Sequence, residues 1–183
     1  MMDFNLLVQN VRWQIAHNYT TNKDFATIAF GGSYGGMLAA WLRMKFPQTF
    51  QGALASSAPI LFFEGSVSPY AYNEVATASF AKYDASCPDI IRKGFGTLVD
   101  WRDKPEQYAA VGLAFNLCTP PTKGAEIDAV IGFVNGALGT MAMVNYPYAT
   151  DFINPMPPWP VHEACIAAMK VPLINDEAYV IAL

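Results

Sequence analysis

Apolar residues in the first sixty positions follow two different spacings, and each spacing predicts a different element. Residues 4–16 carry apolar side chains at helical spacing, and a polar, turn-like stretch follows over 18–24. Residues 25–30 form a short apolar run with β-branched and aromatic members, which is typical of a buried parallel strand. A helical pattern returns over 34–45, and residues 52–56 predict a second strand. This order of helix, strand, helix and strand indicates a piece of an α/β sheet over residues 1–64.

The pattern changes near residue 65, after which no further strand–helix alternation follows. Ser86 begins a predicted helix as a capping residue, with Pro88 and Asp89 in the first turn, and this helix runs toward Trp101. A second helix is predicted by a stripe of apolar residues on one face, made of Ile127, Val130, Ile131, Val134, Leu138 and Met141. Residues 65–183 are therefore predicted to form a mostly helical second domain.

Prolines predict extended or turning chain in the last third of this domain. They occur in residues 146–148 and 155–160, and each proline biases the residue before it away from helix. A last short helix is predicted over 164–169.

Composition and charge exclude several classes of protein. The chain has 183 residues, of which 53% are hydrophobic and 14% charged, so it is expected to fold around a sizeable core. Its net charge of −4 and its scattered Lys and Arg residues give no nucleic-acid surface. The apolar run over 129–150 is long enough for a membrane span, but Asn135, Asn145, Pro147 and three glycines favour a helix outside the membrane. No cysteine pair has metal-site spacing, so no metal or cofactor is expected.

One motif carries chemistry, the Gly-x-Ser-x-Gly run centred on Ser33. A strand is predicted just before it and a helix just after it, which is the context of a nucleophile elbow. Such a turn needs small residues beside the serine, and Gly31, Gly35 and Gly36 meet that need. We therefore predict that Ser33 is the nucleophile of a serine hydrolase and that the backbone N–H of Tyr34 helps to bind the oxyanion. An inert glycine turn and a phosphate cradle are the alternatives, although the glycine spacing fits neither standard phosphate motif.

A catalytic triad also needs an acid and a histidine after the serine. The sequence has two histidines, and His17 precedes Ser33 at the end of a predicted helix, where a surface role is expected. His162 follows Ser33 but lies in a proline-rich approach to a helix, where no sheet strand is predicted. Neither histidine is therefore expected to act as the base.

Three segments closely resemble one family of serine peptidases. They read GGSYGGMLAAWLRMKFP over residues 31–47, GALASSAP over 52–59 and YPYATDF over 146–152, the last followed by Pro-Met-Pro at 155–157. The chain resembles the lysosomal Pro-Xaa carboxypeptidase and dipeptidyl peptidase II family over nearly its whole length. The resemblance implies a partial α/β-hydrolase core followed by a helical domain inserted over the site. It also implies exopeptidases that cleave peptides next to proline, in lysosomes or after secretion.

Several residues of this chain take roles from the resemblance alone. Ser33 matches the family nucleophile, and Met37 matches a position that helps to line the pocket for the substrate's proline ring. Cys87 and Cys165 match a disulfide-bonded pair, and Cys118 matches a cysteine whose partner lies further along the chain of relatives. The acid and histidine of the family also lie further along, and the chain has no signal peptide, so we expect a fragment that is inactive in isolation. The resemblance also allows a homodimer of the full-length protein.

The sequence leaves some choices open. Asn18-Tyr19-Thr20 is an acceptor for N-glycosylation, which would suit a lysosomal or secreted protein. Features of both the carboxypeptidase and the dipeptidyl peptidase branches are present, so the branch is undecided. A non-catalytic peptide-binding relative and a lipase or esterase on the same core are the alternative functions.

Overall fold

The structure is a computed structural model that describes residues 1–19, 25–63 and 65–183. It divides into two compact units, Met1–Pro69 and Tyr70–Leu183, which are called the elbow unit and the helical unit below. Most of the predicted polar turn over 18–24 and the predicted domain boundary at residue 64 lie outside the described residues.

The elbow unit has the predicted order of elements. These are α1 (Met2–Asn18), β1 (Ile28–Gly32), α2 (Tyr34–Lys45) and β2 (Gly52–Ser56). The prediction placed β1 at 25–30, which is wrong by two to three residues at each end. The strand starts late because the N–H of Thr27 is used by a side chain and not by a neighbouring strand: it donates to Gln51 Oε1 at 2.7 Å. The carbonyl of Thr27 accepts from the backbone N–H of Gln51 at 2.9 Å. It ends late because its last two residues are glycines, whose permissive backbone extends the strand to the turn.

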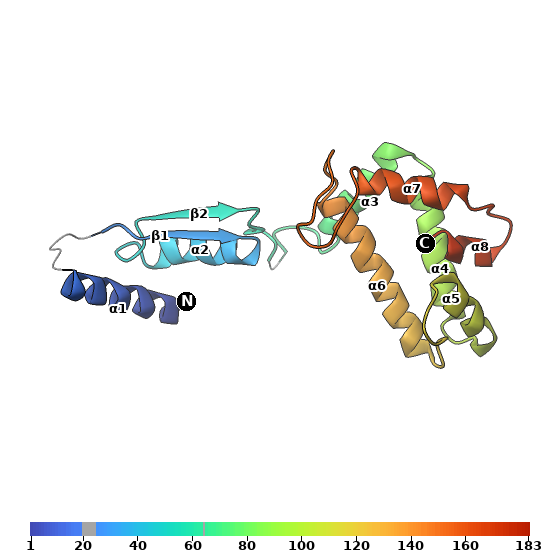
Figure 1. The fold of residues 1–183 in the computed structure, drawn as a ribbon, viewed down its shortest axis with the longest axis horizontal. Helices are drawn as coiled ribbons and strands as arrows, with labels where there is room; N and C mark the ends of the chain where they lie inside the picture. Colours follow the sequence, from blue (N-terminus) through green and yellow to red (C-terminus); the bar gives the residue numbers. More distant parts are fainter. Residues whose placement is uncertain (20–24, 64) are drawn as a thin grey trace. The chain divides into compact units, whose positions relative to one another are not determined.

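The two strands are parallel, and α2 packs against both of them (Figure 1). The register pairs Ile28 with Gly52 and Phe30 with Leu54. The prediction that the first strand is buried is wrong in this structure, because Phe30 is 73% exposed and Ile28 and Leu54 are about half exposed. Side chains alternate between the two faces of a sheet, and these three lie on one face, while the intervening residues of β1 are partly covered.

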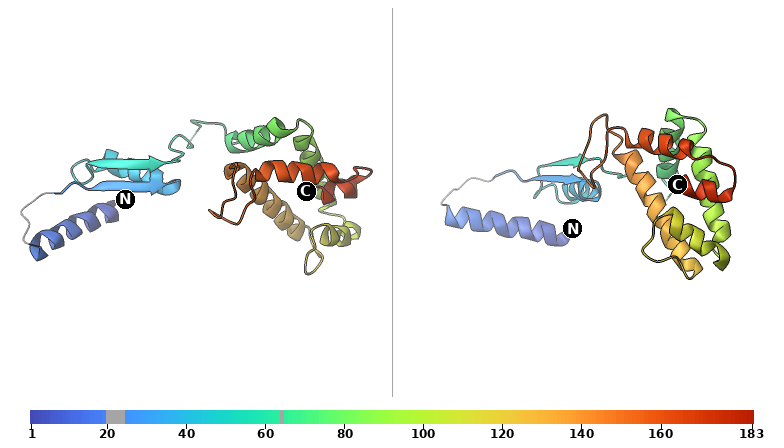
Figure 2. Two further views of the ribbon diagram at one scale, coloured as in Figure 1. Left: turned by 45° about the horizontal axis from the view of Figure 1, so that its top comes forward. Right: turned by 45° about the vertical axis from the view of Figure 1, so that its right-hand side comes forward.

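Helices and their connecting segments make up the helical unit, which Figure 2 shows in two further views. Its elements are α3 (Ala71–Tyr83), α4 (Cys87–Trp101), a 3-10 turn (Pro105–Gln107), α5 (Tyr108–Ala114), α6 (Gly124–Met143), α7 (Pro160–Lys170) and α8 (Asp176–Ile181). The helices predicted from Ser86 and from the apolar stripe are confirmed as α4 and α6. The helix predicted at 164–169 is wrong at its start, because Pro160 opens α7 at a position where a missing N–H costs nothing. The sequence did not predict α3, α5 or α8, which have weak or short patterns.

The helical unit buries a continuous apolar core. Its largest cluster comprises Leu98, Trp101, Tyr108, Val111, Ile127, Val130, Val134 and Val180. A second cluster surrounds a disulfide bond between Cys87 of α4 and Cys165 of α7, whose Cα atoms lie 5.6 Å apart. This is the pair that the resemblance implies. Among the described residues, no helix combines the length and the apolar character that a membrane span requires.

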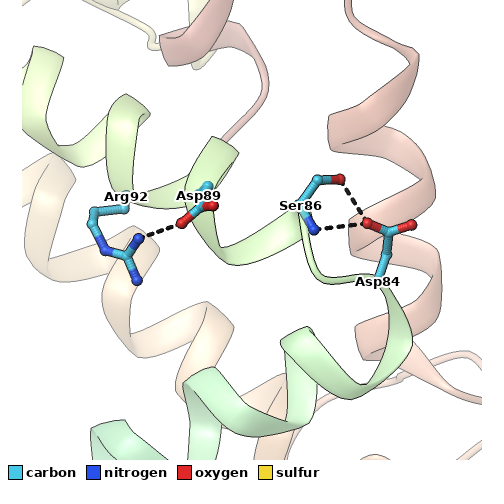
Figure 3. Close-up of polar contacts among 4 residues, drawn as sticks. All are labelled: Asp84, Ser86, Asp89 and Arg92. Carbon is cyan, nitrogen blue, oxygen red and sulfur yellow. Dashed lines mark hydrogen bonds and ion pairs between the residues drawn. The ribbon is translucent and has the colours of Figure 1, made fainter.

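The start of α4 differs from the predicted cap. The Ser86 side chain makes no capping hydrogen bond to the helix; instead, its hydroxyl and its backbone N–H donate to Asp84 Oδ1 at 2.6 and 2.8 Å (Figure 3). These two hydrogen bonds to the charged form lower the pKa of Asp84 below its ordinary value of 3.8. The predicted capping role of Ser86 is thus wrong, because its backbone is already helical (φ −83°, ψ −22°), whereas a residue whose side chain caps a helix is usually extended.

Candidate active site

Ser33 stands at the junction of β1 and α2 with a strained backbone. Its φ is 55° and its ψ is −124°, in a region that non-glycine residues rarely occupy. Two backbone hydrogen bonds hold it there: Ser33 N–H donates to Ser56 O at 3.0 Å, and Ser33 O accepts from Met37 N–H at 3.2 Å. The side chain is exposed and makes no capping hydrogen bond to α2, so its hydroxyl is free of that role.

The glycines around Ser33 are required to different degrees. A Cβ on Gly31 would lie 2.0 Å from Gly35 O, and a Cβ on Gly36 would lie 2.9 Å from Ala58 Cβ. These two positions therefore exclude any side chain without backbone movement. A Cβ on Gly35 would meet nothing within 4 Å, so the predicted need for glycine at that position is wrong. The crowding lies between the strand ends and the backbone of the first turn of the helix, including the carbonyl of Gly35, whereas the Cβ direction of Gly35 itself is open.

The first turn of α2 supplies positive charge beside Ser33. Tyr34 is the first residue of the helix, and the N–H groups of a first turn have no acceptor within the helix. The helix dipole adds a partial positive charge at the same end. Negative charge that develops on an atom bound at Ser33 is therefore stabilised by this helix end. The first turn of α2 contains no acidic residue that would oppose this effect.

Met37 occupies the interior of the elbow unit. Its side chain is only 4% exposed, and it lies in α2 one turn after Ser33. It belongs to the small core that holds α2 against the sheet. The predicted contact between Met37 and a substrate's proline ring stays a prediction.

Both histidines interact with neighbours in their own units. In α1, His17 Nδ1 lies 2.8 Å from Trp13 O, and the two rings are 4.1 Å apart. In α7, the ring of His162 packs at 4.2 Å from the ring of Tyr83. These contacts describe a helix-end histidine and a packed surface histidine, and the expectation that neither is the base stays a prediction.

The remaining predicted positions lie on the surface. Cys118 is an exposed free thiol. Asn18 is exposed at the last residue of α1, whereas Thr20 of its acceptor triplet lies outside the described residues. No group of three His, Cys, Asp or Glu side chains in the described part of the chain is arranged to hold a metal ion.

The helical unit contains a cavity of about 460 Å³ among α3, α4 and α6. Two of the hydroxyl groups in its lining are paired: Tyr72 OH donates to Gly139 O at 2.7 Å, and Thr140 Oγ1 donates to Gly136 O at 2.9 Å. The guanidinium of Arg92 forms an ion pair with Asp89 (Figure 3). The described residues that line this cavity include no Cys, His, Asp or Glu side chain, and we assign no chemistry to it.

Sequence reasoning missed one feature of the site, the backbone of Ser57. This residue follows β2 and has a φ of 48°. A serine after a strand gives no local signal of a left-handed backbone, and glycine or asparagine would have been the expected residue there. The pairing of β1 with β2 places it next to Ser33.

Comparison with known proteins agrees with this geometry. The profile of the family described as serine carboxypeptidase S28 matches residues 2–180. The chain is 39% identical over 149 residues to a lysosomal Pro-X carboxypeptidase of Mus musculus, a match that covers 81% of this chain and 30% of the relative. It is 39% identical over 138 residues to the Bos taurus protein of the same name, covering 75% of this chain and 28% of the relative. It is also 38% identical over 157 residues to a Caenorhabditis elegans prolyl carboxy peptidase like protein 5. That match covers 84% of this chain and 31% of the relative.

The matched regions cover most of this chain but about three tenths of each relative. The family profile matches almost the whole chain, including the strand, the elbow and the helical unit. This chain therefore belongs to the serine carboxypeptidase S28 family.

Proposed function

We propose that this chain carries the nucleophile of a serine-type exopeptidase, Ser33, which cleaves peptides next to a proline. The observation that carries the proposal is the strained backbone of Ser33 between a strand and a helix N-terminus. Because the relatives found are named Pro-X carboxypeptidases, we propose that the enzyme releases the C-terminal residue that follows proline, rather than an N-terminal dipeptide.

The proposed reaction proceeds through an acyl-enzyme. Ser33 Oγ attacks the carbonyl carbon of the proline residue, and its proton passes to a base. The N–H of Tyr34 stabilises the oxyanion of the tetrahedral intermediate. The intermediate collapses, the C–N bond breaks, and the leaving amine takes the proton from the base. Water then hydrolyses the ester between Ser33 and the proline carbonyl.

The proposal includes what the full-length protein supplies. We propose that the base and its orienting acid come from residues outside 1–183, because the chain spans about three tenths of its curated relatives. Residues 1–64 then form part of an α/β-hydrolase core, and 65–183 form a helical cap. The relatives' names support a lysosomal location, and the substrate is a proline-containing peptide.

The test is labelling of the full-length protein with a fluorophosphonate probe. We expect Ser33→Ala to reduce labelling and cleavage of N-acetyl-Ala-Pro-Phe by at least about a thousandfold. The control is Ser79→Ala, which removes a hydroxyl in α3 that donates to Val75 O. Undiminished labelling of Ser33→Ala would refute the nucleophile. Turnover of p-nitrophenyl butyrate with no turnover of any proline peptide would favour an esterase, and turnover of Ala-Pro-amide alone would favour a dipeptidyl peptidase.

A further inference from the structure

Two strained residues lie side by side in the elbow unit. Ser33 follows β1 and has a φ of 55°, and Ser57 follows β2 and has a φ of 48°. The parallel register pairs Gly32 with Ser56, so the two serines occupy the next position on adjacent strands. Neighbouring strands lie about 4.8 Å apart, which puts the backbone of Ser57 at the edge of the sheet where Ser33 stands.

The conformation of Ser57 affects the support of Ser33 directly. The carbonyl of Ser56 accepts the N–H of Ser33 at 3.0 Å. That carbonyl belongs to the peptide group joining Ser56 to Ser57, so the φ of Ser57 sets its direction relative to the chain that follows. If the φ of Ser57 rotated to a negative value, either the Ser56 carbonyl would turn away from Ser33 N–H or the chain after Ser57 would take another direction.

The chain after Ser57 is fixed by the elbow as well. A Cβ on Gly36 would lie 2.9 Å from Ala58 Cβ and 3.0 Å from Ser56 O, so these atoms wall the first turn of α2. Ala58 O accepts the N–H of Ile60 at 2.8 Å, which continues the reversal of the chain. Both sides of Ser57 thus contact the elbow, one through a hydrogen bond to Ser33 and the other through packing against Gly36.

We propose that Ser57 is a positioning residue for the reaction at Ser33, and that it acts through its left-handed backbone and not through its hydroxyl. It holds the Ser56 carbonyl in register with β1 and places Ala58 against the first turn of α2. Residues in such sparsely populated conformations persist where the surrounding structure requires them, often at functional sites. The inference rests on the proposed function, since it concerns the reactivity of the Ser33 nucleophile.

Two variants of the full-length protein separate the effect of the backbone conformation of Ser57 from the effect of its hydroxyl group. Ser57→Thr keeps the hydroxyl but adds a β-branch, which opposes a positive φ. Ser57→Gly removes the hydroxyl but adopts a positive φ freely. We expect the kcat for N-acetyl-Ala-Pro-Phe to fall about tenfold in Ser57→Thr, with KM unchanged, because the left-handed backbone then carries a larger cost. We expect Ser57→Gly to stay within about twofold of the natural enzyme.

Active sites are counted by burst titration with the fluorophosphonate probe, and rates are expressed per titrated site. A purely structural role would reduce the number of sites and leave the rate per site unchanged, which would overturn the inference. A loss per site in Ser57→Gly as large as that in Ser57→Thr would also overturn it, because a residue that adopts the positive φ freely would then fail to preserve the rate. Ser79→Thr in α3 is the control for the same substitution on a helical backbone.

If Ser57→Thr yields no folded protein, Ser57→Ala takes its place. Alanine disfavours a positive φ less strongly than threonine, so we expect a rate per site about threefold below that of Ser57→Gly. A rate per site for Ser57→Ala equal to or above that of Ser57→Gly would contradict the inference. Ser33→Ala reports separately on the proposed function, since continued labelling of that variant would refute the nucleophile whatever Ser57 does.

Discussion

The two units differ in how they treat apolar side chains. The strands of the elbow unit expose them and are each followed by a serine with a positive φ. The helical unit buries them, and a disulfide bond joins its helices α4 and α7. Phe30 of β1 is 73% exposed, while Leu98 at the centre of the helical unit is fully buried. Positive φ values also occur in the helical unit, at Asn116 and Trp159, but these residues follow α5 and precede α7 in connecting segments. The contrast shows a packed core in the helical unit and a sparsely covered sheet in the elbow unit, to which we have proposed that the nucleophile belongs.

The largest expected effect comes from removing the disulfide bond between Cys87 and Cys165 in the helical unit. Replacing Cys87 and Cys165 together with serine should lower the free energy of unfolding of this unit by roughly 4 kcal/mol, because the bond closes a loop of 78 residues. Thermal or urea unfolding measures the loss. The control Cys118→Ser changes an exposed free thiol and should have little effect. Equal stability of the double variant and the natural chain would show that the disulfide adds nothing to the packed core.

Two leucine truncations sharpen the difference in burial. Leu98→Ala empties a fully buried position in α4 and should cost about 3 kcal/mol, from lost burial and from the cavity left behind. Leu54→Ala changes a half-exposed position in β2 and should cost less than about 1 kcal/mol. Urea unfolding of each unit provides both values. A larger loss for Leu54→Ala would mean that the exposed face of the sheet is covered in solution.

Two glycine substitutions test the crowding of the elbow. Gly31→Ala places a Cβ 2.0 Å from a backbone oxygen and should destabilise the elbow unit by about 2 to 3 kcal/mol, with loss of fluorophosphonate labelling. Gly35→Ala enters open space in the first turn of a helix and should leave stability unchanged or slightly raised. Thermal unfolding of the two variants makes a matched comparison. Similar melting temperatures for both would contradict the observed turn.

The smallest expected effect is a pH dependence at the start of α4. The hydrogen bonds from Ser86 lower the pKa of Asp84 in the folded chain, so the ionised carboxylate favours folding. This contribution is present above the pKa of the unfolded chain, near 3.9, and is lost as the pH falls through the lower folded value. Asp84→Asn should therefore be slightly less stable than the natural chain at pH 6, and the difference should shrink as the pH falls through the lowered folded pKa of Asp84. A difference that grows toward low pH would have the wrong sign.

The sequence predicted the order of elements around Ser33 better than their exact bounds and backbone geometry. The strand, turn and helix around Ser33 follow from glycine spacing and apolar runs, which are local signals. The left-handed Ser57 has no local signal, and the residues on either side of it contact another segment: Ser56 O accepts from Ser33 N–H, and Ala58 lies against Gly36. The late start of β1 likewise depends on Gln51, which lies 24 residues beyond its partner Thr27.

In the helical unit, too, the sequence predicted the helices with strong local signals and missed the others. Helix α6 was predicted because its apolar stripe repeats over about four turns, and α4 because proline and an acidic residue mark its start. Helix α3 was missed because a single residue of it, Phe80, is buried, so no stripe marks its inner face. The disulfide followed from the resemblance alone, since three cysteines permit three pairings.

The central claim, that Ser33 is the nucleophile, is tested most directly by mapping the site of fluorophosphonate modification. The full-length protein is labelled and digested with trypsin, and the peptides are sequenced by mass spectrometry. The account predicts an adduct on the peptide of residues 24–43, located at Ser33 and not at Thr27 or Tyr34. An adduct on any other peptide, with residues 24–43 recovered unmodified, would contradict it.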